Sequence, residues 1–219
     1  MKTTRRALLA HCTALALATA GLATRPCVAQ AQPAAPVVLV LGDSMSAEYG
    51  LARGQGWVAL LSQRLAADPR HKGLSVVNAS ISGDTTAGGR SRLPALIKRH
   101  RPAVVVIELG GNDALRGLPL SMTRENLQAM ARAAKEAGAK VLLVGMQIPP
   151  NYGRQYSDDF AAAFVTVAKS EGVALVPFLL KGVSDAMFQA DRIHPREEAH
   201  PLMLDNVWAG LKPLLLPVN

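Results

Sequence analysis

The stretch VVLVLGDS, residues 37–44, joins an apolar run to a glycine, an aspartate and a serine. A short run rich in Val and Leu predicts a strand that is buried on both faces of a parallel sheet. Four more such runs follow, at residues 75–78, 104–109, 141–145 and 173–177. Helical stretches are expected between and after them, at residues 57–66, 89–100, 123–137, 157–171 and 196–215. This alternation predicts a three-layer α/β/α domain built on a five-stranded, parallel, doubly wound sheet.

The first 31 residues are expected to be a cleaved signal peptide. Basic residues at Lys2, Arg5 and Arg6 precede an apolar stretch at residues 7–23, and Ala29-Gln30-Ala31 follows as a cleavage site. A retained membrane anchor would need about 20 apolar residues, and this stretch is shorter. The arginine pair leaves general secretion and twin-arginine export as alternatives. We therefore expect a periplasmic or secreted protein without a stable membrane anchor.

The mature chain is expected to hold one domain, residues 37–219, after a short lead-in at residues 32–36. Removing 31 of the 219 residues leaves 188, which suits one domain with a sizeable core. The cut also removes both cysteines and four basic residues but no acidic one, so the formal charge falls from +8 to +4. The basic run at residues 98–101 is typical of a helix C-terminus. The mild basic excess argues against a nucleic-acid partner, and we expect a monomer.

Four short polar motifs are expected to meet at one edge of the sheet. They follow the first, second, third and fifth apolar runs, at residues 42–44, 82–84, 110–113 and 191–194. Because ligand sites in such sheets lie beyond the carboxyl ends of the strands, the motifs converge there. Unrelated turns and helix caps would explain each motif separately, but not their common position.

The motifs contain the groups that a serine hydrolase needs. A serine hydroxyl is a weak nucleophile without a base, and His194 would take the proton from Ser44. Asp191 lies three residues before His194, so its carboxylate can orient the imidazole. The alternative roles are structural: Ser44 as a helix N-cap, and Asp191 to Pro195 as a capped turn. Asp43, Asp84 and Asp113 are expected to hold loops together rather than to act as catalytic acids.

From about Val37 to Leu215, the chain resembles the SGNH (GDSL) hydrolase family, in particular its bacterial thioesterase I, lysophospholipase and arylesterase branch. The similarity includes SISGDTT at residues 80–86, ELGGND at 108–113 and IPPNYG at 148–153. The resemblance implies a flavodoxin-like fold and the triad Ser44, Asp191 and His194. It also implies an oxyanion hole made by the Ser44 and Gly83 backbone N–H groups and the Asn112 side-chain amide.

The resemblance also points to acyl-binding loops. In the related thioesterases the loops at residues 115–120 and 148–152 correspond to segments that contact the acyl chain. The expected substrate-binding residues are Leu115, Leu118, Ile148, Pro149, Tyr152 and Ile193. The branch often has glycine at the position of Arg192, where a long cation could draw in anionic substrates or project into solvent.

No metal or cofactor is expected. His194, Glu197, Glu198 and His200 share one segment, but the two histidines are six residues apart, whereas helical zinc sites pair them four apart. Neither a Gly-x-Gly-x-x-Gly nor a Walker pattern follows a strand.

The sequence therefore predicts a serine esterase that hydrolyses small-molecule acyl esters and thioesters, such as aryl esters, acyl-CoA and lysophospholipids, through an acyl-enzyme. A carbohydrate O-deacetylase of the same superfamily is the first alternative, although few aromatic residues are available to stack on sugars. A non-catalytic binding protein on this fold is the second alternative, and the intact Ser44, Asp191 and His194 argue against it.

Overall fold

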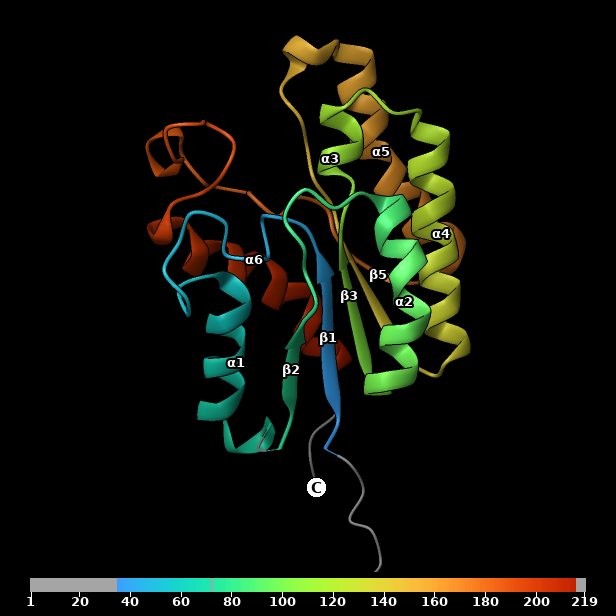
Figure 1. Cartoon of the computed structure of the whole chain (residues 1–219), viewed down its shortest axis with the longest axis vertical. Helices are drawn as coiled ribbons and strands as arrows, with labels where there is room; N and C mark the ends of the chain where they lie inside the picture. The colour runs from blue at the N-terminus through green and yellow to red at the C-terminus, as the bar shows by residue number, and fades with distance from the viewer. Residues whose placement is uncertain (1–34, 72, 216–219) are drawn as a thin grey trace, which may run out of the picture. The chain divides into compact units, whose positions relative to one another are not determined.

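The computed structural model describes residues 35–71 and 73–215. These residues form a five-stranded parallel sheet with helices on both faces (Figure 1), so the predicted α/β architecture is confirmed. The expected signal peptide, residues 1–31, and most of the lead-in lie outside the described residues. None of the described helices combines the length and the apolar character that crossing a bilayer requires.

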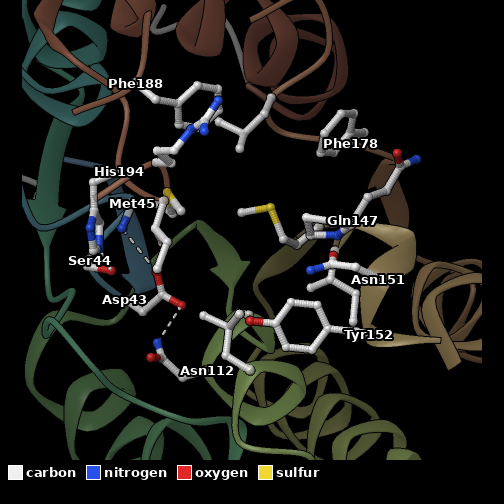
Figure 2. Close-up of a pocket in the computed structure, with 18 of the residues that line it drawn as sticks. Asp43, Ser44, Met45, Asn112, Gln147, Asn151, Tyr152, Phe178, Phe188 and His194 are labelled. Carbon is white, nitrogen blue, oxygen red and sulfur yellow. Dashed lines mark hydrogen bonds between the residues drawn. The ribbon is translucent and has the colours of Figure 1, made fainter. Parts of the chain in front are cut away.

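The sheet reverses its direction of growth next to its first strand. Its members are β1 (Val37–Gly42), β2 (Ser75–Asn78), β3 (Val104–Glu108), β4 (Lys140–Val144) and β5 (Ala174–Val176). They lie in the order β2-β1-β3-β4-β5 and pair in parallel, so β1 has β2 on one side and β3 on the other. In doubly wound sheets the crevice at this reversal is the place where ligands bind. The segments that follow β1, β3, β4 and β5 surround the pocket shown in Figure 2.

Two groups of helices cover the sheet. The α-helices are α1 (Trp57–Ala67), α2 (Thr86–His100), α3 (Gly111–Leu115), α4 (Leu120–Glu136), α5 (Arg154–Glu171) and α6 (His200–Leu211). Helices α1 and α6 pack together on one face, and α2, α4 and α5 lie side by side on the other (Figure 1). Short 3₁₀ turns occupy Pro69–His71, Pro150–Tyr152, Asp185–Met187, Glu197–Ala199 and Lys212–Leu214.

The main difference from the predicted elements concerns the last helix. The sequence predicted one helix over residues 196–215, whereas the α-helix covers only His200–Leu211, with a 3₁₀ turn on each side. Two prolines account for these limits. Pro201 has no N–H and fits the first turn of a helix, whereas the ring of Pro213 disfavours continuation of the helix through the residue before it.

The other helix boundaries differ less from the predicted ones. Helices α2, α4 and α5 each begin three residues earlier than predicted, at Thr86, Leu120 and Arg154. The start of α2 is fixed by Thr85, whose side chain accepts a hydrogen bond from the Gly88 amide at 3.3 Å. Helix α3 was not predicted because its five residues are too few to show a helical period.

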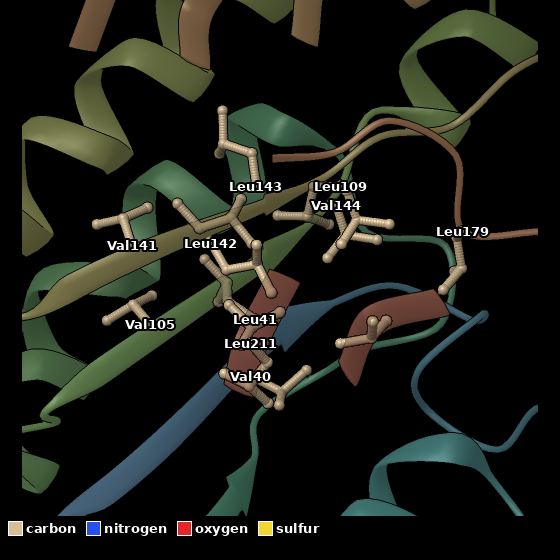
Figure 3. Close-up of a cluster of buried hydrophobic side chains, with 14 of the residues drawn as sticks. Val40, Leu41, Val105, Leu109, Val141, Leu142, Leu143, Val144, Leu179 and Leu211 are labelled. Carbon is tan, nitrogen blue, oxygen red and sulfur yellow. The ribbon is translucent and has the colours of Figure 1, made fainter. Parts of the chain in front are cut away.

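Alternate side chains of the central strands pack into both helical layers (Figure 3), and two glycines bring helices close to the sheet. A Cβ at Gly89 of α2 would lie 2.3 Å from Cδ1 of Leu109, and one at Gly210 of α6 would lie 3.0 Å from Cδ1 of Leu142. Strands β1 and β3 are buried along almost their whole length. Burying one such Val or Leu side chain contributes about 1.5–3 kcal/mol to folding, so these strands form a rigid base for the loops at their carboxyl ends.

Candidate active site

The turn after β1 places Ser44 at the wall of the pocket. Gly42 is needed there because an added Cβ would come 2.8 Å from both Oε2 of Glu108 and the side chain of Ser46. The Asp43 carboxylate then accepts a hydrogen bond from the Met45 amide at 3.0 Å, and its carbonyl accepts one from Ala47 at 2.9 Å. The resulting tight turn leaves the Ser44 side chain among the groups that line the pocket.

The Ser44 hydroxyl begins a chain of two short hydrogen bonds. Its Oγ lies 2.9 Å from Nε2 of His194, and Nδ1 of that imidazole lies 2.7 Å from Oδ2 of Asp191. The other carboxylate oxygen, Oδ1, accepts the backbone N–H groups of Ile193 at 2.9 Å and His194 at 3.0 Å. The structure therefore brings together the three residues that the sequence predicted as a triad.

These contacts keep the Asp191 carboxylate ionised. Its pKa is lowered to about 2, first by the hydrogen bond from the His194 backbone, then by those from the His194 ring and the Ile193 backbone. An ionised carboxylate at Nδ1 fixes the tautomer in which Nδ1 carries the proton. Nε2 is then free to accept the proton of the Ser44 hydroxyl, which is the geometry that general-base activation requires.

Three N–H donors were predicted near Ser44. The Nδ2 atom of Asn112 donates one hydrogen bond to Oδ2 of Asp43 at 3.0 Å, so Asp43 holds this amide in place and its second N–H can point elsewhere. Gly83 has φ +79°, which favours glycine, and its carbonyl accepts a hydrogen bond from Nη2 of Arg116 at 2.9 Å. Within residues 35–71 and 73–215, neither the Ser44 nor the Gly83 backbone amide donates a hydrogen bond to the protein.

Two buried carboxyl groups lie behind the turn. Burial raises the pKa of Asp43 to about 6, outweighing the hydrogen bonds from Met45 and Asn112. Burial, followed by the nearby Asp43 charge, raises the pKa of Glu108 well above its ordinary value. Oε2 of Glu108 accepts a 2.7 Å hydrogen bond from Ser46. The only signal for this environment in the sequence is that Glu108 interrupts the apolar run at residues 104–109.

Asp84 and Asp113 hold loops, as predicted. Oδ1 of Asp84 accepts a hydrogen bond from the Thr85 amide at 2.9 Å, and Oδ2 accepts one from Nε of Arg92 at 2.8 Å. Oδ2 of Asp113 is buried and accepts a hydrogen bond from the Thr86 amide at 2.9 Å. These bonds connect the loop after β2 with α2, and the start of α2 with α3.

A cavity of about 760 Å³ extends from Ser44 and His194. Five of the six predicted substrate-binding residues line it: Leu115, Ile148, Pro149, Tyr152 and Ile193. The sixth, Leu118, does not line the cavity, and its carbonyl accepts a hydrogen bond from the Tyr156 hydroxyl at 3.2 Å. The volume falls within the range of small-molecule sites, which is about 300–1,000 Å³.

Sequence reasoning missed much of the apolar lining of this cavity. The additional apolar side chains are Met45, Met146, Phe178, Leu180 and Phe188. In the view of Figure 2, Phe178 and Phe188 form one side of the cavity, and Asn112 and Tyr152 lie on the opposite side. Most of these residues follow β4 and β5 without forming a motif, so their position after a strand was the one available signal.

Arg192 also lines the cavity, and its backbone is left-handed with φ +57°. This conformation costs a residue with a Cβ roughly 1–2 kcal/mol, which explains why glycine suits the position in the family that the chain resembles. Arg192 is also exposed, so its side chain lies both at the cavity and at the solvent. Within the described part of the chain, no carboxylate oxygen forms an ion pair with its guanidinium.

The histidine and glutamate residues that could have suggested a metal site have other surroundings. Nδ1 of His200 accepts a hydrogen bond from the Trp57 amide at 3.0 Å, and burial lowers the pKa of this imidazole. In the portion of the chain that the structure describes, no group of three or more His, Cys, Asp or Glu side chains is arranged to hold a metal ion.

A hydroxyl, an imidazole and a carboxylate in hydrogen-bonded series, at the switch point of an α/β sheet, are the arrangement of a serine hydrolase. The particular family is shown by comparison: the model of the GDSL-like lipase/acylhydrolase family matches residues 40–202. The chain belongs to this family, which confirms the predicted resemblance and the predicted class of carboxylic ester hydrolase.

The relatives are esterases and thioesterases by name. Esterase TesA of Pseudomonas aeruginosa is 52% identical over 213 residues, covering 96% of this chain and 100% of that protein. Thioesterase 1/protease 1/lysophospholipase L1 of Escherichia coli K12 is 42% identical over 184 residues, covering 83% of this chain and 86% of that protein. A crystal structure of TesA matches with a TM-score of 0.79 at 55% identity, covering 82% of this chain and 99% of that one.

Proposed function

We propose that this protein is an exported serine esterase that cleaves acyl esters and thioesters through an acyl-enzyme on Ser44. The observation that carries the proposal is the series from Ser44 Oγ through His194 to Asp191, at the wall of an apolar cavity. The family membership supports it, since the matched family is one of lipases and acylhydrolases.

Acylation begins when Oγ of Ser44 attacks the carbonyl carbon of the ester or thioester, while Nε2 of His194 takes the hydroxyl proton. The negative charge that develops on the carbonyl oxygen is stabilised by the N–H groups of Ser44, Gly83 and Asn112. The bond to the leaving group then breaks, and His194 donates its proton to the departing alcohol or thiol. Asp191 remains ionised and stabilises the imidazolium in between.

Deacylation repeats these steps with water. Nε2 of His194 takes a proton from a water molecule, whose oxygen attacks the acyl carbon. The second tetrahedral intermediate collapses, Ser44 regains its proton from His194, and the carboxylic acid leaves. The cycle consumes one water per ester and restores the resting hydrogen bonds.

The cavity supports a broad acyl range. Its lining is mainly apolar, and three of the lining residues, Leu115, Tyr152 and Ile193, are exposed to solvent. We expect short to medium acyl and aryl esters, acyl-CoA thioesters and lysophospholipids to be hydrolysed with overlapping preference. The names of the relatives, esterase and thioesterase/lysophospholipase, agree with this range.

Replacement of the nucleophile tests the proposal directly. Ser44→Ala should abolish hydrolysis of a nitrophenyl ester and labelling by a fluorophosphonate, because it removes the oxygen that forms the acyl-enzyme. Ser121→Ala, at an exposed position in α4, is the matched control and should keep both. Labelling or turnover that persists in Ser44→Ala would overturn the assignment of the nucleophile.

The substrate range is tested with nitrophenyl esters of increasing acyl length, beside an acyl-CoA and a lysophospholipid. Hydrolysis of all three substrate types supports the proposal. Release of acetate from an acetylated glycan, with no hydrolysis of longer acyl esters, would instead establish the carbohydrate O-deacetylase.

Export and oligomeric state have separate tests. We expect secretion to the periplasm or medium with cleavage after Ala31, so the intact mass of the exported protein should correspond to a chain that begins at Gln32. Light scattering should give the mass of a monomer. An unprocessed N-terminus in the exported protein would contradict cleavage after Ala31. A dimer mass would contradict the monomer.

A further inference from the structure

We infer that Tyr49 and Gln189 form a clamp that positions the His194 imidazole for proton transfer, with Tyr49 stacked on the ring and Gln189 joining the two loops. Neither residue belongs to the four motifs that predicted the site. The inference rests on the proposed role of His194 as the general base.

The stacking contact covers one face of the imidazole. The ring centroids of Tyr49 and His194 are 4.3 Å apart and the rings are inclined by 36°. The hydrogen bonds to Ser44 and Asp191 lie along the ring edge, so they resist rotation within the plane but leave the ring free to tip out of it. A side chain against the face opposes this tipping. The residue Tyr49 is itself 49% exposed, so burial in the core does not explain its position.

Gln189 ties the loop of Tyr49 to the loop of His194. Its Nε2 donates hydrogen bonds to the carbonyls of Tyr49 and Pro195, both at 3.0 Å. Its backbone amide donates to the His194 carbonyl at 2.8 Å, and its own carbonyl accepts from the Arg192 amide at 2.9 Å. Gln189 thus holds the backbone on both sides of His194. It also holds the backbone of Tyr49, whose ring stacks on the imidazole.

Gly50 shows how closely the two loops approach. A Cβ there would lie 2.2 Å from Oε1 of Gln189, and the backbone has φ +73°. Both facts favour glycine, because any larger side chain would push the Gln189 amide away and would strain the turn. The close contact between the Tyr49 loop and Gln189 therefore depends on glycine at position 50.

The clamp has its largest effect when the imidazole carries charge. During acylation the hydroxyl proton moves to Nε2 as Oγ bonds to carbon, and the imidazolium then lies between Asp191 and the leaving group, with the aromatic ring against one face. The negative face of a tyrosine ring attracts a cation that lies over it. Because this attraction appears in the transition state and not in the bound ground state, its loss should lower kcat and leave KM nearly unchanged.

The test compares the mature protein with Tyr49→Ala and Tyr49→Phe. We expect Tyr49→Ala to lower kcat about 5- to 20-fold with KM within twofold, and to slow fluorophosphonate labelling of Ser44 by a similar factor. Tyr49→Phe retains the ring and should restore most of both rates. Val165→Ala, which removes an exposed apolar group from α5, controls for a general loss of surface packing.

Two variants test the Gln189 part. Gln189→Ala and Gly50→Ala should each lower kcat several-fold, and Tyr49→Ala combined with Gln189→Ala should cost less than the product of the two single effects, because both act on the same ring. Thermal unfolding of every variant is measured, and rates are compared well below the transition.

Two outcomes separate the clamp from the proposed function. An inactive wild type would mean that the proposed function fails. An active wild type with Tyr49→Ala within twofold of its kcat, or Tyr49→Phe as slow as Tyr49→Ala, would overturn the clamp.

Discussion

Asp43→Asn is expected to make the protein more stable above neutral pH and less active. Burial raises the pKa of Asp43 from 3.8 to about 6, so the folded state resists ionisation of this group. The sign follows from linkage: a carboxyl whose pKa is raised by folding favours the folded state below pH 4, and this advantage is lost as the pH rises through 6. A difference between 3.8 and about 6 corresponds to about 3 kcal/mol of unfolding free energy once the group is fully ionised.

The effect is isolated by following, as a function of pH, the difference in unfolding free energy between Asp43→Asn and wild type. About 2 kcal/mol of the total should develop between pH 4.5 and pH 8, because ionisation of the unfolded chain has already begun at the lower pH. Urea unfolding of both proteins at the two pH values measures it, and the unfolding free energy of Asp43→Asn should rise relative to wild type by this amount. Asp158→Asn, at an exposed position in α5, controls for the loss of one charge.

The same substitution should lower kcat by about 10- to 100-fold. The Asn112 amide now donates to an Asp43 oxygen at 3.0 Å, and an asparagine at position 43 can present an N–H there instead of an acceptor. The Asn112 side chain must then turn, which misaligns its other N–H.

The stability prediction has its own refuting result. If the difference in unfolding free energy between Asp43→Asn and wild type changes by less than about 0.5 kcal/mol from pH 4.5 to pH 8, the reasoning about burial is wrong.

Two further substitutions address the donors and the cavity. Asn112→Ala removes one donor from the developing oxyanion, so kcat should fall roughly 100- to 1,000-fold with little change in KM, and steady-state kinetics showing a rise in KM alone would contradict that role. Arg192→Gly should raise the unfolding free energy in urea by about 1 kcal/mol because glycine adopts φ +57° without strain. It should also lower kcat/KM for a carboxylate-bearing nitrophenyl ester relative to its neutral homologue, and an unchanged ratio would leave Arg192 without influence on substrate charge.

The fold was predictable because its central strands are buried on both faces. Runs such as Val104–Ile107 are then apolar throughout, and the alternation with helices leaves few other architectures. The triad was predictable for a related reason: each motif follows a strand, and parallel strands end at one edge. The boundaries set by capping were less accessible, as at Thr85, where a single side chain–backbone hydrogen bond starts the helix earlier.

Other parts of the site depend on contacts between distant segments. Glu108 and Ser46 are 62 positions apart and Tyr49 and His194 are still further apart, so no local pattern joins them. The walls formed by Phe178 and Phe188 come from a loop that lacks periodicity and motifs. Leu118 was expected at the cavity together with Leu115, but residues three apart in a turn need not face the same way. The carbonyl of Leu118 instead accepts a hydrogen bond from the Tyr156 hydroxyl.

The loop that carries Asp191 and His194 has a consequence for the evolution and engineering of the enzyme. Its acid and base are connected within four residues, because Asp191 binds both the imidazole and the backbone amides that lead to it. Part of the apolar wall comes from a different segment, the one after β4, with Met146, Ile148 and Pro149. This part of the acyl-binding wall is therefore separate from the proton-transfer unit. Exchange of the segment at residues 146–152 between relatives should transfer chain-length preference while leaving the reactive unit intact.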